Sequence, residues 1–128
     1  MNGFFEEIMM KNNITGFTSI IILLLITQFY SPQASANNAA KNICEYVAAN
    51  DKKRLRSLLK TQRIKIRSIF SDVTCNGKNL LMFAAISNAD KVGEMIIKKL
   101  PKKILRSLID ELTTTSPTLG ALAKKRSG

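Results

Sequence analysis

The hydrophobic and polar positions of residues 76–101 form two blocks, which together predict a pair of short helices joined by a polar break. Asn76 and Gly77 both tolerate positive φ, so the start of the segment indicates a tight turn. Residues 80–86 are apolar nearly all round, which is typical of a helix buried between neighbours. Asn79 is placed to cap the N-terminus of that helix through its side-chain oxygen.

The second block predicts an amphipathic helix after the break at residues 88–90. Asp90 is its expected N-cap, because a carboxylate can accept hydrogen bonds from the first backbone N–H groups of a helix. Pro101 ends the element, since proline cannot continue the backbone hydrogen bonding. The apolar residues between them recur at the spacing of one helix face and are Val92, Met95, Ile96 and Leu100.

A similar pair of helices is predicted upstream. Residues 39–49 give a first helix, and Asn50 and Asp51 interrupt it, with Asp51 as the cap of the next helix. The apolar positions of that next helix repeat those of the downstream one at a shift of 37 residues, and Asn50 matches Asn88 at a shift of 38. The two halves therefore indicate a degenerate internal repeat.

Residues 51–73 allow three interpretations, because they contain neither Gly nor Pro. We favour two helices with a kink near Gln62, since one helix of this length would outrun its short partners. The second interpretation is a single long helix with apolar residues in heptad register. The third is a strand at residues 63–67, where basic and apolar residues alternate, although it has no obvious partner.

Pro101 also suits the first turn of a last helix, and apolar residues at helical spacing extend that helix to Leu112. The polar run that follows is expected to end it. We therefore predict one small helical domain at residues 37–112 and a flexible basic tail at residues 113–128.

Residues 76–100 resemble one ankyrin repeat, which is a turn followed by a small-residue inner helix and an aliphatic outer helix. Residues 79–82 depart from the Thr-Pro-Leu-His run of that family, and Asn88 replaces its glycine between the helices. With the internal repeat, the resemblance predicts an all-α fold of two ankyrin-like helical hairpins plus a C-terminal helix. The matching residues are Gly77, Leu81, Ala84, Ala85, Val92, Ile96 and Ile97.

A second resemblance covers residues 43–101. The segments ICEYVAANDKKRLRSLLK and CNGKNLLMFA are similar to a small family of exported Gram-negative bacterial proteins of unknown function. This resemblance implies a secreted domain with two cysteines and no known activity.

Residues 1–36 have the pattern of a cleaved signal peptide. Seven consecutive Ile and Leu residues at 20–26 lie within an apolar stretch, and Ala34-Ser35-Ala36 supplies the small residues of a cleavage site. The alternative is an uncleaved inner-membrane anchor, although the apolar core is short of the roughly 20 residues that a spanning helix needs. Cleavage predicts a periplasmic or secreted chain with 19 Lys and Arg against 7 Asp and Glu, a net charge of +12.

The residue inventory argues against an enzyme. The chain has no His, which removes the usual general base and most zinc sites, and it has no Cys-x-x-Cys pair for redox chemistry. Asp51 and Asp90 are accounted for as helix caps. Asp110 and Glu111 diverge too widely on a helix to form an acid–base pair. We therefore expect no catalytic residue, no metal ion and no cofactor.

Cys44 and Cys75 are the two cysteines of the chain. In an exported protein an even number of cysteines favours a disulfide. Their expected places fit such a bond, one on the first helix and the other in the turn before the second hairpin. The alternative is a pair of buried free cysteines that pack as small hydrophobic residues.

Eight positive charges with no acid among them fall within residues 52–67. Like charges four residues apart on a helix repel each other, so a uniform patch often marks an anionic partner. The alternative is the solvated face of an amphipathic helix. The eight residues are Lys52, Lys53, Arg54, Arg56, Lys60, Arg63, Lys65 and Arg67.

Together these features predict a non-enzymatic, exported binding or structural domain that engages an acidic protein or an anionic component of the cell envelope. The alternative is a membrane-tethered or membrane-surface protein whose basic amphipathic helix contacts lipid. Export and the scarcity of aromatic residues near the basic patch argue against nucleic acid as the partner.

Overall fold

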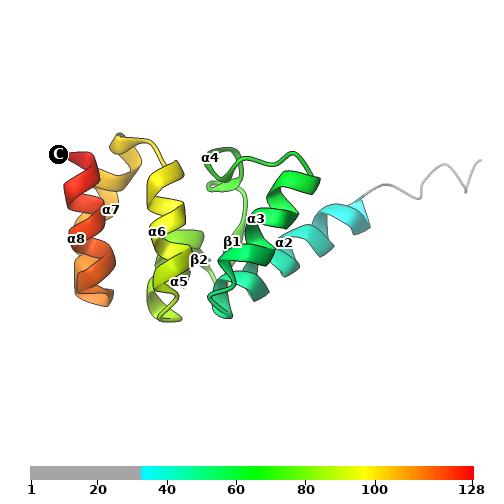
Figure 1. Cartoon of the computed structure of the whole chain (residues 1–128), viewed down its shortest axis with the longest axis horizontal. Helices are drawn as coiled ribbons and strands as arrows, with labels where there is room; N and C mark the ends of the chain where they lie inside the picture. Colours follow the sequence, from blue (N-terminus) through cyan, green and yellow to red (C-terminus); the bar gives the residue numbers. More distant parts are fainter. Residues whose placement is uncertain (1–32) are drawn as a thin grey trace, which may run out of the picture. The chain divides into compact units, whose positions relative to one another are not determined.

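The computed structural model describes residues 33–128, and within them it has seven helices and one two-stranded hairpin (Figure 1). The predicted all-α fold is confirmed. The predicted signal peptide lies outside the described residues except for positions 33–36, where the first helix already begins. No helix among the described residues is long and apolar enough to cross a membrane. The elements are α2 (Gln33–Ala48), α3 (Lys52–Thr61), α4 (Ile66–Ile69), β1 (Thr74–Cys75), β2 (Lys78–Asn79), α5 (Leu80–Ile86), α6 (Asp90–Lys99), α7 (Lys102–Thr115) and α8 (Pro117–Ser127).

Six of the seven described helices pair into three hairpins, α2/α3, α5/α6 and α7/α8, that stand in a row, and the short α4 follows the first hairpin (Figure 1). α6 packs against both α3 and α8, and α5 packs against α7, so the middle hairpin shares its core with both neighbours. In Figure 1 the turn inside each hairpin lies at the bottom of the picture; we call this side of the row its lower end and the opposite side its upper end. The C-terminal ends of α3, α6 and α8 all lie at the upper end.

The third hairpin replaces the flexible tail that the sequence had suggested at residues 113–128. Ser116 caps α8 by accepting a hydrogen bond from the Leu119 N–H at 3.3 Å, and Pro117 occupies the first turn, where a missing N–H is no loss. Leu119 and Ala123 are fully buried, so α8 belongs to the core. The prediction was wrong because a Ser-Pro pair that ends one helix can also begin another.

Two glycines allow α8 to lie close to its neighbours. A Cβ atom on Gly120 would stand 2.6 Å from the Cα atom of Thr113 on α7. A Cβ atom on Gly93 of α6 would stand 2.5 Å from the side chain of Leu119. Both distances are shorter than unbonded carbon atoms tolerate. At Gly120 the close atom belongs to the backbone, so a larger residue would require movement of α7 or α8; at Gly93 the close atoms belong to the Leu119 side chain, which would have to shift.

Three helices end in a left-handed residue with the paired hydrogen bonds of a Schellman motif, and the N···O distances of those bonds are 2.8–3.3 Å. Asn50 and Asn88, which the internal repeat had matched, have φ angles of 54° and 53°. Arg63, at the end of α3, has a φ angle of 55°. This break divides residues 51–73 into α3 and α4 as favoured, and the interpretations as one long helix or a strand are wrong.

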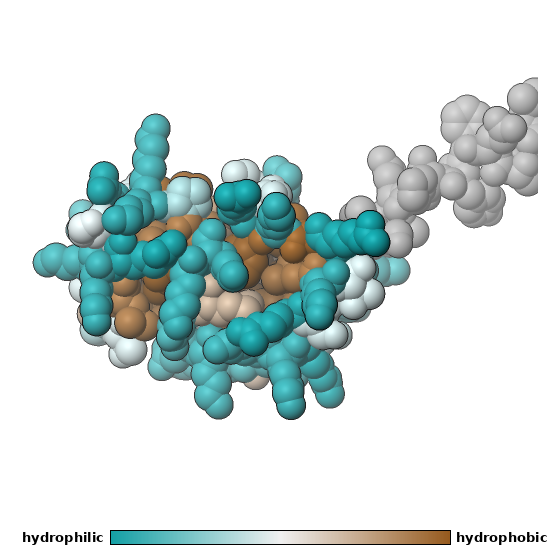
Figure 2. Space-filling model, turned by 45° about the horizontal axis from the view of Figure 1, so that its top comes forward, coloured by the Kyte–Doolittle hydropathy of each residue, from teal (hydrophilic) through white to brown (hydrophobic). Residues whose placement is uncertain are grey.

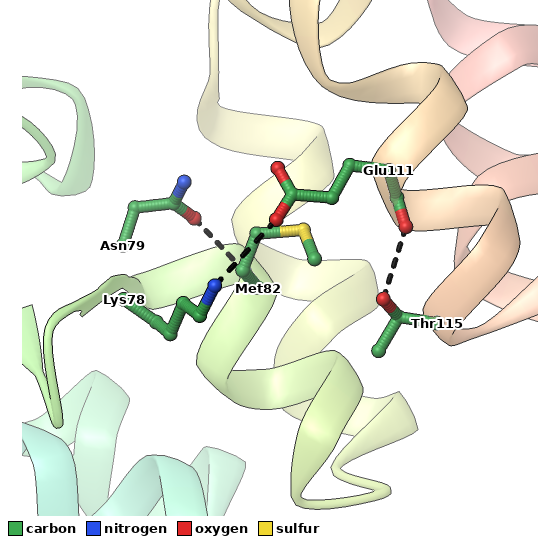
Figure 3. A network of polar contacts seen from close by, with 5 residues as sticks. All are labelled: Lys78, Asn79, Met82, Glu111 and Thr115. Atoms are coloured by element: carbon green, nitrogen blue, oxygen red, sulfur yellow. Dashed lines mark hydrogen bonds and ion pairs between the residues drawn. The ribbon is translucent and has the colours of Figure 1, made fainter.

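Two of the three predicted N-caps are confirmed. Asp51 accepts a hydrogen bond from the Arg54 N–H at 2.9 Å. Asn79 accepts one from the Met82 N–H at 2.9 Å (Figure 3).

The third predicted cap, Asp90, is wrong, because Asp90 is already the first residue of α6 and the element begins without a side-chain cap of its own. Asn50 supplies the hydrogen bond instead, by accepting from the Val92 N–H at 3.1 Å. The turn of the first hairpin thus caps the outer helix of the second hairpin. One asparagine side chain joins two residues that are 42 positions apart in the sequence.

The turn predicted at Asn76 and Gly77 is confirmed, with φ angles of 52° and 75° in the loop between β1 and β2. From β2, the Lys78 Nζ atom lies 3.8 Å from a carboxylate oxygen of Glu111 on α7 (Figure 3). The β-hairpin therefore reaches toward the third helical hairpin.

The predicted disulfide is also confirmed. Cys44 on α2 and Cys75 on β1 are bonded, with their Cα atoms 5.6 Å apart, so the alternative of two free cysteines is wrong. Because Cys75 is buried and Cys44 is half-buried, the bond lies at the margin of the core. It fastens the first helix to the β-hairpin that precedes α5.

Candidate anion-binding site

A groove of about 630 Å³ opens between α3, the α3–α4 connection, α4 and α6. Its floor is apolar, because each of these elements contributes a residue from the margin of the core. Leu59, Ile66 and Met95 are buried there, and Ile64 is half-buried. The floor thus combines residues from two hairpins and from the short helix between them.

The rim of this groove carries six cations, and no acid lines it. All six side chains are exposed. On the face of Figure 2, which turns the upper end of the row toward the reader, hydrophobic surface lies between projecting hydrophilic side chains. We call this site the basic groove, and its cations are Arg56, Lys60, Lys65, Arg67, Lys98 and Lys99.

The structure divides the eight cations of the predicted patch. Arg56, Lys60, Lys65 and Arg67 line the basic groove. The others do not, because Lys52, Lys53 and Arg54 begin α3 at the opposite end of the row (Figure 1), and Arg63 lies at the break after α3. Within that second group, Arg54 is also paired with the carboxylate of Asp51 at 3.3 Å.

Sequence reasoning missed the cations that the second hairpin contributes. Lys98 and Lys99 end α6, some thirty residues beyond the predicted patch, and they face it only because α6 packs against α3 and α4. The internal repeat carried a usable signal, since it matched α3 with α6. Outer helices of successive repeats pack side by side, so the basic ends of both were candidates for a single site.

Glu94 is the acid of α6 that bears on the charge of this site. The Nζ atom of Lys98 lies 2.7 Å from its carboxylate. That hydrogen bond and the charge of Lys98, with a smaller effect of Lys52, hold the pKa of Glu94 below its usual value. Among the described residues, the other five cations of the basic groove have no acid within 4.0 Å.

A second groove of about 370 Å³ lies between α6 and α8. Ile97 and Leu122 give it apolar surface, Lys125 and Arg126 of α8 line it, and so does Glu94 of α6. Lys98 lines both grooves and is paired with Glu94. Cations therefore continue from α3 across α6 to α8, with one acid, Glu94, among them.

The chemistry that the basic groove offers is attraction and apolar contact. Its lining contains Arg, Lys, Leu, Ile and Met, without a carboxylate, hydroxyl, thiol or imidazole. Within the part of the chain that the structure describes, no three His, Cys, Asp or Glu residues are grouped so as to hold a metal ion. The site can thus hold an anion with an apolar part.

Comparison with known proteins identifies a family but no activity. The model of a family described as "Protein of unknown function (DUF3718)" matches residues 43–107, which is half of the chain and includes both cysteines and the whole basic groove. No curated protein and no solved structure matches the chain. The resemblances to ankyrin repeats and to an exported bacterial family are tested by none of these findings and stay predictions.

Proposed function

We propose that this chain, which belongs to the DUF3718 family of proteins of unknown function, is a non-enzymatic binding domain whose basic groove engages an anionic partner outside the cytoplasm. The observation that carries the proposal is the composition of the groove. Six cations surround an apolar floor, and no acid lines the site. Such a surface attracts anions and gives their apolar parts a place to pack.

Stability alone does not explain this arrangement of charges. Exposed cations gathered around one recess repel each other, and the groove offers them no counter-charge except through the pair of Lys98 with Glu94. A bound anion would remove that repulsion. The partner is therefore expected to be an acidic protein or an anionic component of the envelope, and not a second copy of this strongly basic chain.

Export remains part of the proposal. It is supported by the signal-peptide pattern of residues 1–36 and by the disulfide, because such bonds persist in oxidising compartments. The non-enzymatic character is supported by a groove lining that has no group of the usual acid–base or nucleophilic kinds. Nucleic acid is disfavoured because no aromatic residue lines the groove for base stacking.

The test compares two variants of equal charge. In the first, Arg56, Lys60, Lys65 and Arg67 of the groove become Gln; in the second, the control, Lys52, Lys53, Arg54 and Lys91 become Gln. The exported protein, purified from expressing cells, is bound to isolated envelope fractions and eluted with increasing salt. We expect the groove variant to elute at clearly lower salt than both the parent and the control.

Two outcomes would count against the proposal. If both variants lose binding equally, net charge and not the groove carries the interaction. If neither variant changes elution, the basic residues form a solvated surface. Vesicles of anionic lipid provide a further arm, because binding to pure lipid as strong as to the envelope would favour the membrane-surface alternative over a protein or polymer partner.

A further inference from the structure

The basic groove is one part of a larger charged surface at the upper end of the row in Figure 1. Segments that are far apart in the sequence bring their basic residues to this end: the end of α3, the connection to α4, the junction of α6 with α7, and the end of α8. All twelve side chains concerned are exposed. We call this surface the basic edge; its residues are Lys60, Arg63, Lys65, Arg67, Lys98, Lys99, Lys102, Lys103, Arg106, Lys124, Lys125 and Arg126.

Helix stability explains only some of these positions. Cations in the last turn of a helix interact favourably with the negative end of its dipole. This interaction explains the basic residues at the ends of α3, α6 and α8. Lys102 and Lys103 lie in the first turn of α7, where the dipole disfavours cations and favours acids. That turn contains no acid. These two cations are therefore placed against the stability of their own helix.

Hydrogen bonds from two arginines hold the α8 part of the basic edge in place. Arg126 donates to the Ile97 carbonyl of α6 at 3.0 Å. Arg106 of α7 donates twice to the Ser127 carbonyl, at 3.1 and 3.0 Å. Because the end of α8 is fastened to both α6 and α7, its cations keep fixed positions relative to those of α6.

The length of the basic edge sets the size of its ligand. Outer helices pack in sequence from α3 to α6 to α8, and neighbouring helix axes lie about 8–10 Å apart, so the edge spans roughly 16–20 Å. Charges interact in physiological salt over a Debye length of about 8 Å. One small anion would therefore feel only part of this edge, whereas a chain of repeated anionic groups could contact all of it.

We propose that the basic edge binds a linear polyanion, a polymer of repeated phosphate, sulfate or carboxylate groups, laid across the ends of α3, α6 and α8. This inference rests on the proposed function, and it makes the basic groove one of several subsites. A lipid surface is the less favoured ligand, because interfacial proteins insert apolar side chains and the one large hydrophobic residue exposed among the described residues, Ile86, ends α5 near the opposite end.

The experiment measures how affinity depends on polymer length. The exported protein is titrated with orthophosphate, with short and long linear polyphosphate, and with dextran sulfate and polygalacturonate at several salt concentrations. We expect long chains to bind at least tenfold more tightly per anionic group than orthophosphate, and the salt dependence to steepen with length. A preference among the three polymers identifies which anionic group the edge recognises.

Variants at the far end of the basic edge distinguish this inference from the proposed function. Changing Lys124 and Lys125 to Gln should weaken binding of the long chains and reduce the slope of log affinity against log salt by roughly 1–2, while short chains bind as before. If groove variants lose binding and the far-end variant does not, the proposed function stands and the polyanion inference is wrong. If neither matters, or if anionic vesicles bind more tightly than every polymer, the inference also fails.

A charge reversal separates binding from folding. Changing Lys103 to Glu places an acid at the favourable end of α7 and leaves the hydrogen bond from Lys102 to the Gly128 carbonyl in place, so we expect the Tm to rise or stay level while polymer binding falls. A purely structural role for Lys103 would instead lower the Tm. If polymer binding is unchanged by the reversal, α7 does not belong to the site, and the proposal of one continuous basic edge is wrong.

Discussion

Replacing Cys44 and Cys75 by Ala tests what holds the first hairpin to the rest of the domain. α2 contributes Ile43 and Val47 to the core, and the turn after it caps α6 through Asn50. The disulfide is the covalent tie between this hairpin and the β-hairpin that begins the second. Alanine is preferred to serine at these positions because Cys75 is only 3% exposed, and a hydroxyl buried there would add a penalty unrelated to the bond.

The expected loss follows from the length of the loop that the bond closes. The two cysteines are 31 residues apart, and for a loop of this size the chain-entropy relation gives roughly 3.7 kcal/mol. A domain of this size has a total free energy of unfolding of roughly 5–14 kcal/mol. Because 1 kcal/mol shifts the Tm of a small domain by about 4–8 °C, the variant should melt roughly 15–30 °C below the parent.

Thermal melts followed by circular dichroism measure this loss, with the parent in a reducing buffer as the control. The reduced parent keeps both cysteine side chains, so any difference between it and the alanine variant reports packing and not the cross-link. We expect both to melt far below the oxidised parent. If both instead melt within a few degrees of it, packing alone holds the first hairpin, and the entropic account of the bond is refuted.

Two further predictions concern contacts between hairpins. Asn50→Gly removes the hydrogen bond to the Val92 N–H while keeping a residue that accepts positive φ. Asn88→Gly is its matched control, because the Asn88 side chain makes no hydrogen bond within the described residues. The first variant should lose about 1 kcal/mol relative to the second in denaturant unfolding, the net contribution of one hydrogen bond, and equal stabilities would mean that the Asn50 hydrogen bond does not stabilise the domain. Gly120→Ala should lower the free energy of unfolding by about 1–3 kcal/mol, since its Cβ would meet the Thr113 backbone. An exposed Gly→Ala change inside a helix normally stabilises by up to about 1 kcal/mol, so a higher Tm for this variant would contradict the close packing of α7 and α8.

Much of the fold could be predicted from local patterns, because each hairpin has its own turn and cap signals. Asn76-Gly77, Asp51 and Asn79 each act within a few residues of their own position, and all three behave as the sequence indicated. Asp90 does not, because the cap of α6 comes from Asn50 in another hairpin. A tertiary hydrogen bond of this kind leaves no trace in the local sequence.

The third hairpin shows a different limit. The eleven residues of α8 are small, polar or basic for the most part, and only Leu119, Leu122 and Ala123 mark an apolar face. Its stability comes from close packing at Gly93 and Gly120 and from the arginine hydrogen bonds at its end. Those contacts need α6 and α7 to be in place, so periodicity within the segment was too weak to predict the helix.

The candidate site could be predicted only in part, for a related reason. Charge counting along the chain found the four groove cations of α3 and α4, but it joined them to Lys52, Lys53 and Arg54, which the direction of α3 carries to the opposite end of the row. It missed Lys98 and Lys99, which only the packing of α6 brings to the groove. Charges one or two turns apart share a helix, yet they need not share a site.

Some residues of the basic edge lower the folding stability of the domain. Lys102 and Lys103 oppose the dipole of α7, which costs about 0.3–1 kcal/mol for each charge. Arg63 holds a left-handed backbone conformation that costs a residue with a side chain about 1–2 kcal/mol. Together these terms amount to roughly 2–4 kcal/mol in a domain whose total stability is roughly 5–14 kcal/mol. Such a penalty, concentrated at one end of the row, is expected of a surface that was selected for binding. A bound polyanion would neutralise the cations that oppose the helix dipole, so the stability lost in the unliganded domain would be recovered in part as binding free energy.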